Sequence, residues 1–173
     1  MLQATTDAET LPILVPIDLS ATSSEAILIA AQLAGHSSQP LVILHVAHDD
    51  IHQKNIYPRR SETEQLLPLE EIAETALQNF MTKMRDQYPD TEVLANAGMM
   101  VVSGLPATRI PEIARKISAS LVVMGGNGRT SLSKLIAGSV SEKVIRQSPV
   151  PVTIVHSNGM AWEHSEVDVR QAC

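Results

Sequence analysis

The residues best suited to chemistry form a glycine-rich segment that directly follows the apolar run 120–124. Gly125, Gly128 and Gly138, with Ser139 after them, have the spacing G-x2-G-x9-G-S and lead into an amphipathic stretch that favours a helix. A strand that passes through a glycine loop into a helix can close backbone N–H groups and the positive end of the helix dipole around phosphate oxygens. Turn formation is the alternative to phosphate binding, and it would account for any one of these glycines.

Two better-known phosphate loops do not fit this segment. The chain contains no Gly-Lys-Ser or Gly-Lys-Thr triplet, which a Walker-type loop requires. Gly126-Asn127-Gly128 is followed by Ser131 where the dinucleotide fingerprint has a third glycine, and it lies late in the chain rather than after the first strand. The segment therefore matches neither motif.

The long glycine spacing resembles that of the universal stress protein family, whose nucleotide-binding members carry it at the end of the fourth strand. Residues 14–20 are similar to the family's first strand, which ends in an aspartate, and residues 42–46 to its second strand. Residues 138–144 and 149–152 resemble its last helix and last strand, so the resemblance covers nearly the whole chain. It implies an ATP-binding domain, with Mg²⁺ or Mn²⁺ carried in by the triphosphate.

The resemblance implies a nucleotide site at the carboxyl ends of the strands, where ligands of open parallel sheets bind. Asp18 would contact the nucleoside and the backbone at Val46 would meet the adenine edge. Arg129 would neutralise phosphate charge, with a solvated loop arginine as the alternative. Asp18 and Ser139 are also suited to capping a helix. The expected nucleotide-binding residues are Pro16, Ile17, Asp18, Val46, Met124, Gly125, Gly128, Arg129, Gly138, Ser139 and Val140.

Apolar runs alternate five times with helical patterns, which predicts a parallel sheet covered by helices on both faces. The expected strands are Pro12–Ile17, Leu41–Val46, Glu92–Val102, Ser120–Met124 and Val150–Val155. Right-handed crossovers make a doubly wound, Rossmann-like α/β sheet the expected fold, and the family resemblance supplies the strand order 3-2-1-4-5. At 173 residues the chain suits one domain, residues 11–156, between tails at 1–10 and 157–173.

Helix boundaries are predicted from capping and helix-breaking residues. Thr22 and Glu25 form a capping box for the first helix, and Gly35 is expected to end it. Pro68 is expected in the first turn of the second helix. The core faces of the second and third helices are expected to carry Leu69, Ile72, Ala73, Ala76, Leu77, Phe80, Met84, Ile110, Ile113, Ala114 and Ile117.

Composition narrows the possible functions. A formal net charge of −6 and 2% aromatic residues provide neither the basic surface nor the stacking platforms that a nucleic-acid polymer needs. No apolar run approaches the roughly 18 residues that membrane insertion requires, and no secretory signal is expected. The single cysteine, Cys173, excludes an intrachain disulfide and favours a reduced cytoplasmic setting. Histidines and carboxylates in residues 45–52 are metal-ligand types, but their spacing is not a recognised metal signature.

These features predict an ATP-binding cytoplasmic stress-response protein that acts as a nucleotide-dependent homodimeric switch with an unidentified regulatory protein partner. The apolar strand Val150–Val155 is expected at a sheet edge, where the resemblance points to a homodimer. Two alternatives stand beside it: a slow ATPase or phosphotransferase, and a nucleotide-free dimeric adaptor. Asn127 stands where the family frequently has a histidine, and the sequence offers no nucleophile–base pair beside the glycines, so turnover is not implied.

Overall fold

The structure is a computed structural model that describes residues 10–48, 68–126 and 139–156. Its five strands form one all-parallel sheet. The elements are β1 (Ile13–Ile17), α1 (Ala21–Ser37), β2 (Leu41–Ala47), α2 (Leu69–Gln87), α3 (Glu92–Ala95), β3 (Gly98–Ser103), α4 (Pro106–Lys116), β4 (Leu121–Gly125), α5 (Ser139–Gln147) and β5 (Val152–Val155). The strand order β3-β2-β1-β4-β5 confirms the expected doubly wound fold.

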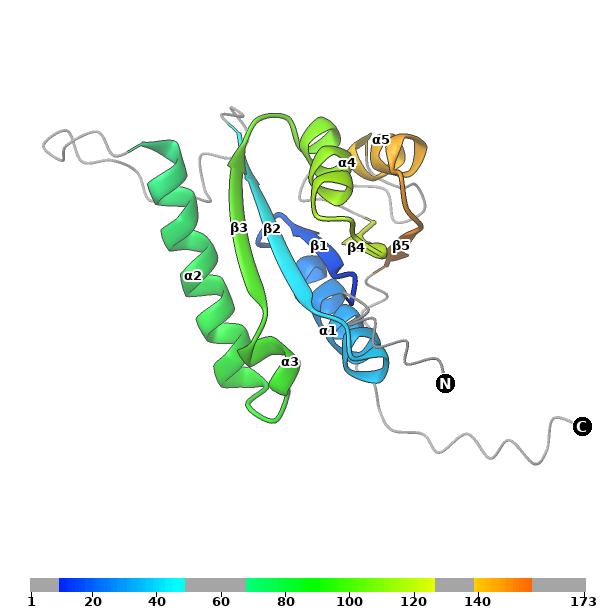
Figure 1. Cartoon of the computed structure of the whole chain (residues 1–173). Helices are drawn as coiled ribbons and strands as arrows, with labels where there is room; N and C mark the ends of the chain where they lie inside the picture. The colour runs from blue at the N-terminus through cyan, green and yellow to red at the C-terminus, as the bar shows by residue number, and fades with distance from the viewer. Residues whose placement is uncertain (1–9, 49–67, 127–138, 157–173) are drawn as a thin grey trace, which may run out of the picture.

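Helices cover both faces of the sheet (Figure 1). The helices α1, α2 and α3 pack on one face, and α4 and α5 pack on the other. All five residues of the central strand β1 are buried, and its side chains alternate between the two cores. Ile13, Val15 and Ile17 belong to the core under α1, whereas Leu14 belongs to the core under α4. This is why the strand is apolar throughout rather than alternating in polarity.

The helix α1 begins at a serine cap and not at the predicted threonine. Ser20 has extended backbone, and its Oγ accepts a hydrogen bond of 3.3 Å from the Ser23 N–H. Thr22 already lies inside the first turn, so the capping box predicted for it is wrong. The preceding Leu19 has a φ of 62°, and this left-handed residue turns the chain so that Ser20 enters the cap position.

The predicted end of α1 at Gly35 is also wrong. The helix continues to Ser37, and Ser38 takes the left-handed conformation that often closes a helix. The N–H groups of Ser38 and Gln39 both reach back to the carbonyl of Ala34. Pro40 gives the physical reason, since it cannot continue the helix and it biases the preceding residue away from helical backbone.

The predicted third strand, 92–102, is divided into two elements. Its first part forms the short helix α3, and only Gly98–Ser103 forms a strand. The helix buries Leu94 completely in the core under α1. The Arg85 Nε–H donates a hydrogen bond of 3.0 Å to the Leu94 carbonyl, which ties this turn to α2. Asn96 ends the helix and separates it from the strand.

Most of the predicted helix core faces are confirmed. The buried residues of α2 and α4 include Ala73, Leu77, Met84, Ile110, Ile113 and Ala114. Met81 is buried in α2, whereas Phe80 is only partly buried at the margin of the core. Pro68 is the N-cap of α2 rather than a residue of its first turn. The strand β5 begins two residues later than predicted, because Ser148 Oγ bonds both the N–H and the carbonyl of Val150 in a turn.

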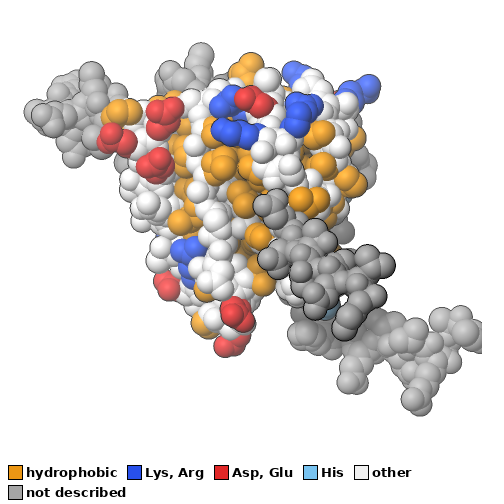
Figure 2. Space-filling view, in the orientation of Figure 1, with side chains coloured by type: hydrophobic (Ala, Val, Ile, Leu, Met, Phe, Trp, Pro, Cys, Tyr) orange, Lys and Arg blue, Asp and Glu red, His pale blue; other side chains and the backbone are white. Residues whose placement is uncertain are grey.

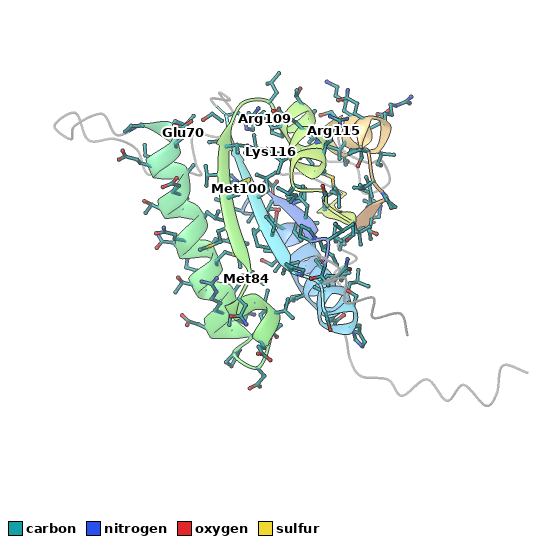
Figure 3. The ribbon with its side chains drawn as sticks, viewed as in Figure 1. Glu70, Met84, Met100, Arg109, Arg115 and Lys116 are labelled. Atoms are coloured by element: carbon teal, nitrogen blue, oxygen red, sulfur yellow. The ribbon has the colours of Figure 1, made fainter. Side chains whose placement is uncertain are left out.

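The two helical layers carry opposite charges. Helices α4 and α5 together hold five basic and two acidic residues, whereas α1 and α2 hold five acidic and two basic residues. Basic side chains gather over α4 and α5, and acidic ones over α2 (Figure 2). Glu70 at the start of α2 and Arg109, Arg115 and Lys116 on α4 lie on opposite sides of Met100 of β3 (Figure 3). The layer that contains α5 therefore attracts anions, although the chain as a whole is acidic. Within the described ranges, no helix is both long and apolar enough to cross a membrane.

Candidate functional site

The strands β1 and β4 are neighbours in the middle of the sheet and are paired at their amino-terminal residues, Ile13 with Leu121 and Leu14 with Val122. The chain leaves β1 for β2 and leaves β4 for β5, so the strand order reverses between β1 and β4, which is the point where open parallel sheets bind their ligands. Gly125 at the end of β4 lies against the start of α1: a Cβ on it would be 2.9 Å from Thr22 Cγ2. The structure thus brings together two segments that lie about a hundred residues apart in the sequence, as expected for a site at the point where the strand order reverses.

Asp18 directly follows β1, and its carboxylate is held in one orientation. Asp18 Oδ1 accepts hydrogen bonds from the Ser20 N–H (3.1 Å) and from the Ser23 hydroxyl (2.7 Å). The same hydroxyl oxygen accepts a hydrogen bond of 3.0 Å from the Asp18 N–H. Among the described residues, no donor is hydrogen-bonded to Asp18 Oδ2. One carboxylate oxygen therefore fixes the turn while the other remains available to a ligand, so the structural role and the ligand role are compatible.

Ser23 is a residue of this site that the sequence reasoning missed. Its side chain is only 3% exposed, and it bonds both the backbone and the carboxylate of Asp18. A buried hydroxyl in this position stops the carboxylate from rotating, because rotation would break two hydrogen bonds. The spacing D-x-S-x-x-S, formed by Asp18, Ser20 and Ser23, is the sequence signal that could have identified it.

His45 of β2 supports the same turn from the neighbouring strand. It is paired in register with Ile17, and its Nδ1 lies 3.0 Å from the Ile17 carbonyl oxygen. Since a carbonyl only accepts, Nδ1 carries the hydrogen in this bond. Burial lowers the pKa of His45 below its usual value, and it outweighs the Ile17 hydrogen bond and the charge of Asp18, which both raise the pKa. The sequence placed His45 in the second strand and in the metal-type run 45–52; the structure shows that its ring bonds the carbonyl that precedes Asp18.

Four of the expected site residues lie at strand ends with buried side chains. Ile17, Val46 and Met124 are less than a tenth exposed, and Pro16 is buried as well. The side chains of Ile17, Val46 and Met124 belong to the two cores, so these residues can meet a ligand chiefly through their backbone. This agrees with the role expected for Val46.

The start of the glycine segment is packed between β5 and α5. The Gly126 N–H donates to the Val155 carbonyl at 2.8 Å, and the Ser141 hydroxyl donates to the Gly126 carbonyl at 3.3 Å. A Cβ on Gly126 would lie 2.7 Å from atoms of both Ile154 and His156. Any larger residue here would force the side chains of Ile154 and His156 to shift.

Some of the expected site lies outside the described residues. Ser139 and Val140 are the first residues of α5. Gly128, Arg129 and Gly138 fall in the range that the structure does not describe, so their roles stay predictions. In the described part of the chain, no three His, Cys, Asp or Glu residues are grouped closely enough to hold a metal ion. Residues 49–52 of the metal-type run 45–52 lie outside it.

The fold is a doubly wound α/β sheet with Asp18 and Gly125 at the strand-order reversal, the point where such sheets bind their ligands. Comparison with known proteins agrees: the model of the universal stress protein family matches residues 10–156, and the chain belongs to this family. Stress response protein NhaX of Bacillus subtilis is 31% identical over 159 residues, which cover 83% of this chain and 96% of NhaX.

Solved structures of family members share the fold. A universal stress protein in complex with cAMP matches with a TM-score of 0.62 and 22% identity, over 86% of this chain and 99% of that one. The universal stress protein of Archaeoglobus fulgidus in complex with dAMP matches with a TM-score of 0.54 and 19% identity, over 85% and 98% of the two chains. Both of these relatives hold an adenine nucleotide.

Proposed function

We propose that this chain binds ATP at the carboxyl ends of β1 and β4, with the nucleoside at Asp18 and the phosphates at the glycine segment and the start of α5. The observation that carries the proposal is the fixed Asp18 carboxylate, which has one oxygen bonded internally and stands beside the end of β4. A hydroxyl of a ribose is a suitable donor to the other oxygen. The adenine nucleotides in complexes of two family members support this choice of ligand.

The phosphate end of the ligand is assigned by electrostatics. Backbone N–H groups at a helix start and the dipole of α5 favour an anion. The basic layer of α4 and α5 lies on the same face of the sheet. Mg²⁺ or Mn²⁺ would accompany the triphosphate and neutralise part of its charge, with its remaining ligands from water.

A conservative substitution tests the nucleoside contact. Asp18→Asn keeps an Oδ1 that can accept from Ser20 and Ser23, but it replaces the available oxygen by an amide donor. We expect ATP affinity to fall roughly tenfold, the usual loss for a hydrogen bond to a charged group, with little change in stability. Asp86→Asn, an exposed carboxylate on α2, is the matched control. Calorimetric titration with ATP measures the affinity of each protein, and equal ATP affinity in the parent and Asp18→Asn would remove Asp18 from the site.

Nucleotide retained through purification gives a simpler first test. Heat denaturation of the purified chain followed by anion-exchange chromatography would identify a released adenine nucleotide. Absence of both retained nucleotide and titratable binding would favour the nucleotide-free adaptor. Turnover of ATP with Mg²⁺ well above the buffer rate would favour the slow ATPase or phosphotransferase.

We further propose that the chain acts in the cytoplasm as a homodimer joined through β5 and that nucleotide occupancy changes its affinity for a regulatory protein partner. The Val122 N–H of β4 donates to the Pro151 carbonyl (3.0 Å), and the N–H of Gly126, directly after β4, donates to the Val155 carbonyl (2.8 Å). Because residues of a strand face its two sides alternately, Thr153 also faces β4, whereas Val152 and Ile154 point their N–H and C=O groups away from the sheet. These outward groups can pair with the same strand of a second copy across a two-fold axis.

A further inference from the structure

A histidine outside the expected site lies against the start of the glycine segment. His156 directly follows β5, and the last register pair of the two strands is Gly125 with Val155. The next residues, Gly126 and His156, are therefore neighbours. The His156 Cε1 and Nδ1 atoms lie 2.7 and 2.8 Å from the position that a Cβ on Gly126 would take. The imidazole thus packs directly on the backbone of Gly126.

The surroundings of this ring place it on the phosphate side of the site. Gly126 is also held by the hydroxyl of Ser141, which lies in the first turn of α5. Ile154 packs beside the ring and belongs to the core under α4 and α5. His156 therefore lies on the same face of the sheet as the start of α5. The His156 residue is exposed, and within the described part of the chain no hydrogen bond or ion pair engages its ring nitrogens.

We propose that His156 is a binding residue for the phosphate end of the nucleotide, an inference that rests on the proposed ATP site. A neutral imidazole offers one N–H donor, and a protonated one offers two donors and a positive charge. Either form complements a phosphate oxygen near the backbone of Gly126. Asp18, in contrast, lies at the end of β1, and β4 separates that strand from β5. His156 should therefore distinguish nucleotides by their phosphates and contribute nothing to recognition of the nucleoside.

Comparison of ATP with adenosine tests this role. His156→Phe keeps a flat ring over Gly126 but removes both nitrogens, and we expect it to weaken ATP binding roughly tenfold. Adenosine binding should stay within about twofold of the parent, because adenosine has no phosphate. The ratio of the two affinities, measured by calorimetric titration, is the decisive quantity. His36→Phe, an exposed histidine on α1, is the matched control.

The possible results distinguish the proposed role of His156 from the proposed ATP site on which it rests. An unchanged ATP affinity in His156→Phe, or an equal loss for ATP and adenosine, would overturn the role of His156 while leaving the ATP site in place. A parent protein that binds neither ligand would overturn the proposed site and His156 together. If the phenylalanine variant fails to fold, His156→Gln serves instead: it retains an amide donor, so it should bind ATP more tightly than His156→Ala and bind adenosine equally well.

Discussion

Gly125 has two physical reasons to be glycine, close packing against α1 and close approach of a phosphate, and a pair of substitutions separates them. A Cβ on Gly125 would lie 2.9 Å from Thr22 Cγ2 and 3.4 Å from Thr22 Cβ. Ordinary contact begins at 3.4 Å, so the Thr22 methyl would have to retreat by about 0.5 Å. The φ of Gly125 is not positive, so an alanine adds no backbone strain of its own.

We therefore expect Gly125→Ala to lower the free energy of unfolding by about 1–3 kcal/mol, the range for overpacking a close contact. Thr22→Ser removes the methyl that clashes and leaves the hydroxyl. The double variant Gly125→Ala with Thr22→Ser should regain most of the lost stability. Urea denaturation followed by circular dichroism gives the four free energies of the cycle, and an interaction energy above about 0.5 kcal/mol would establish the contact.

Titration with ATP on the same four proteins then separates the two reasons. If a phosphate approaches this backbone, the double variant recovers stability but its ATP affinity stays low, because the added Cβ still faces the anion. If both properties return to the parent values, Gly125 serves packing alone. A Gly125→Ala protein as stable as the parent, or one that Thr22→Ser does not rescue, would refute the packing reasoning itself.

Three further substitutions test other parts of the structure. Ser23→Ala should lower the free energy of unfolding by about 1–3 kcal/mol and also weaken ATP binding. Ser20→Ala removes a helix cap, so it should lower the free energy of unfolding by about 1 kcal/mol and leave ATP affinity unchanged. Equal ATP affinities in the two variants would remove Ser23 from the site. Burial lowers the pKa of His45, so this residue binds a proton more readily in the unfolded chain than in the folded one. The free energy of unfolding should therefore fall as the pH drops below about 6.5, by at most about 1.4 kcal/mol per pH unit for this group. Acid denaturation measures this slope, and an equal slope in His45→Asn would contradict the assignment. Ile154→Pro should keep the fold and halve the mass measured by light scattering. Thr153→Pro should instead disrupt the sheet, because the N–H of Thr153 faces β4. A monomeric parent protein, or a dimer that survives Ile154→Pro, would exclude the β5 interface.

The central part of the sheet was predictable because β1, β2 and β4 are buried on both faces. Continuous apolar runs place β1, β2 and β4 to within one or two residues, and glycine and proline separate them from the helices. The strand order came from the family resemblance, since apolar runs contain no information about which strands are neighbours. The third strand was misplaced because Glu92–Ala95 is apolar enough for either structure, and the decision depends on burial of Leu94 against α1 and α2.

The candidate site was predictable only in part. Asp18 and Gly125 were predicted from the family resemblance and from their positions at strand ends, where ligands of open parallel sheets bind, and the structure places both at these ends. The supporting side chains could not be found this way. His45 bonds a carbonyl 28 residues away in the sequence, and His156 packs on Gly126, which directly follows another strand. Such contacts arise from strand register, which exists only in the folded sheet.

The proposed nucleotide site and the proposed dimer interface meet at the end of β5. Gly126 donates its N–H to the Val155 carbonyl, and Ile154 and His156 both pack on Gly126. A phosphate that fixes the Gly126 backbone therefore also fixes the strand whose outer edge is proposed to pair with a second copy. This link explains how ATP could control assembly through a path of three residues rather than through a rearrangement of the whole domain.

Thermodynamic linkage relates ATP binding to dimerisation quantitatively. If ATP binds each site of the dimer more tightly than it binds the monomer by some factor, saturating ATP must tighten the dimer by the square of that factor, because a dimer holds two sites. The dimer dissociation constant can be measured by sedimentation with and without ATP, and the ATP affinity can be compared between the parent dimer and the Ile154→Pro monomer. We expect saturating ATP to lower the dimer dissociation constant by the square of the factor by which the parent dimer binds ATP more tightly than the Ile154→Pro monomer. A dimer dissociation constant that ATP leaves unchanged, in a protein that both binds ATP and dimerises, would show that Gly126 does not connect the two events.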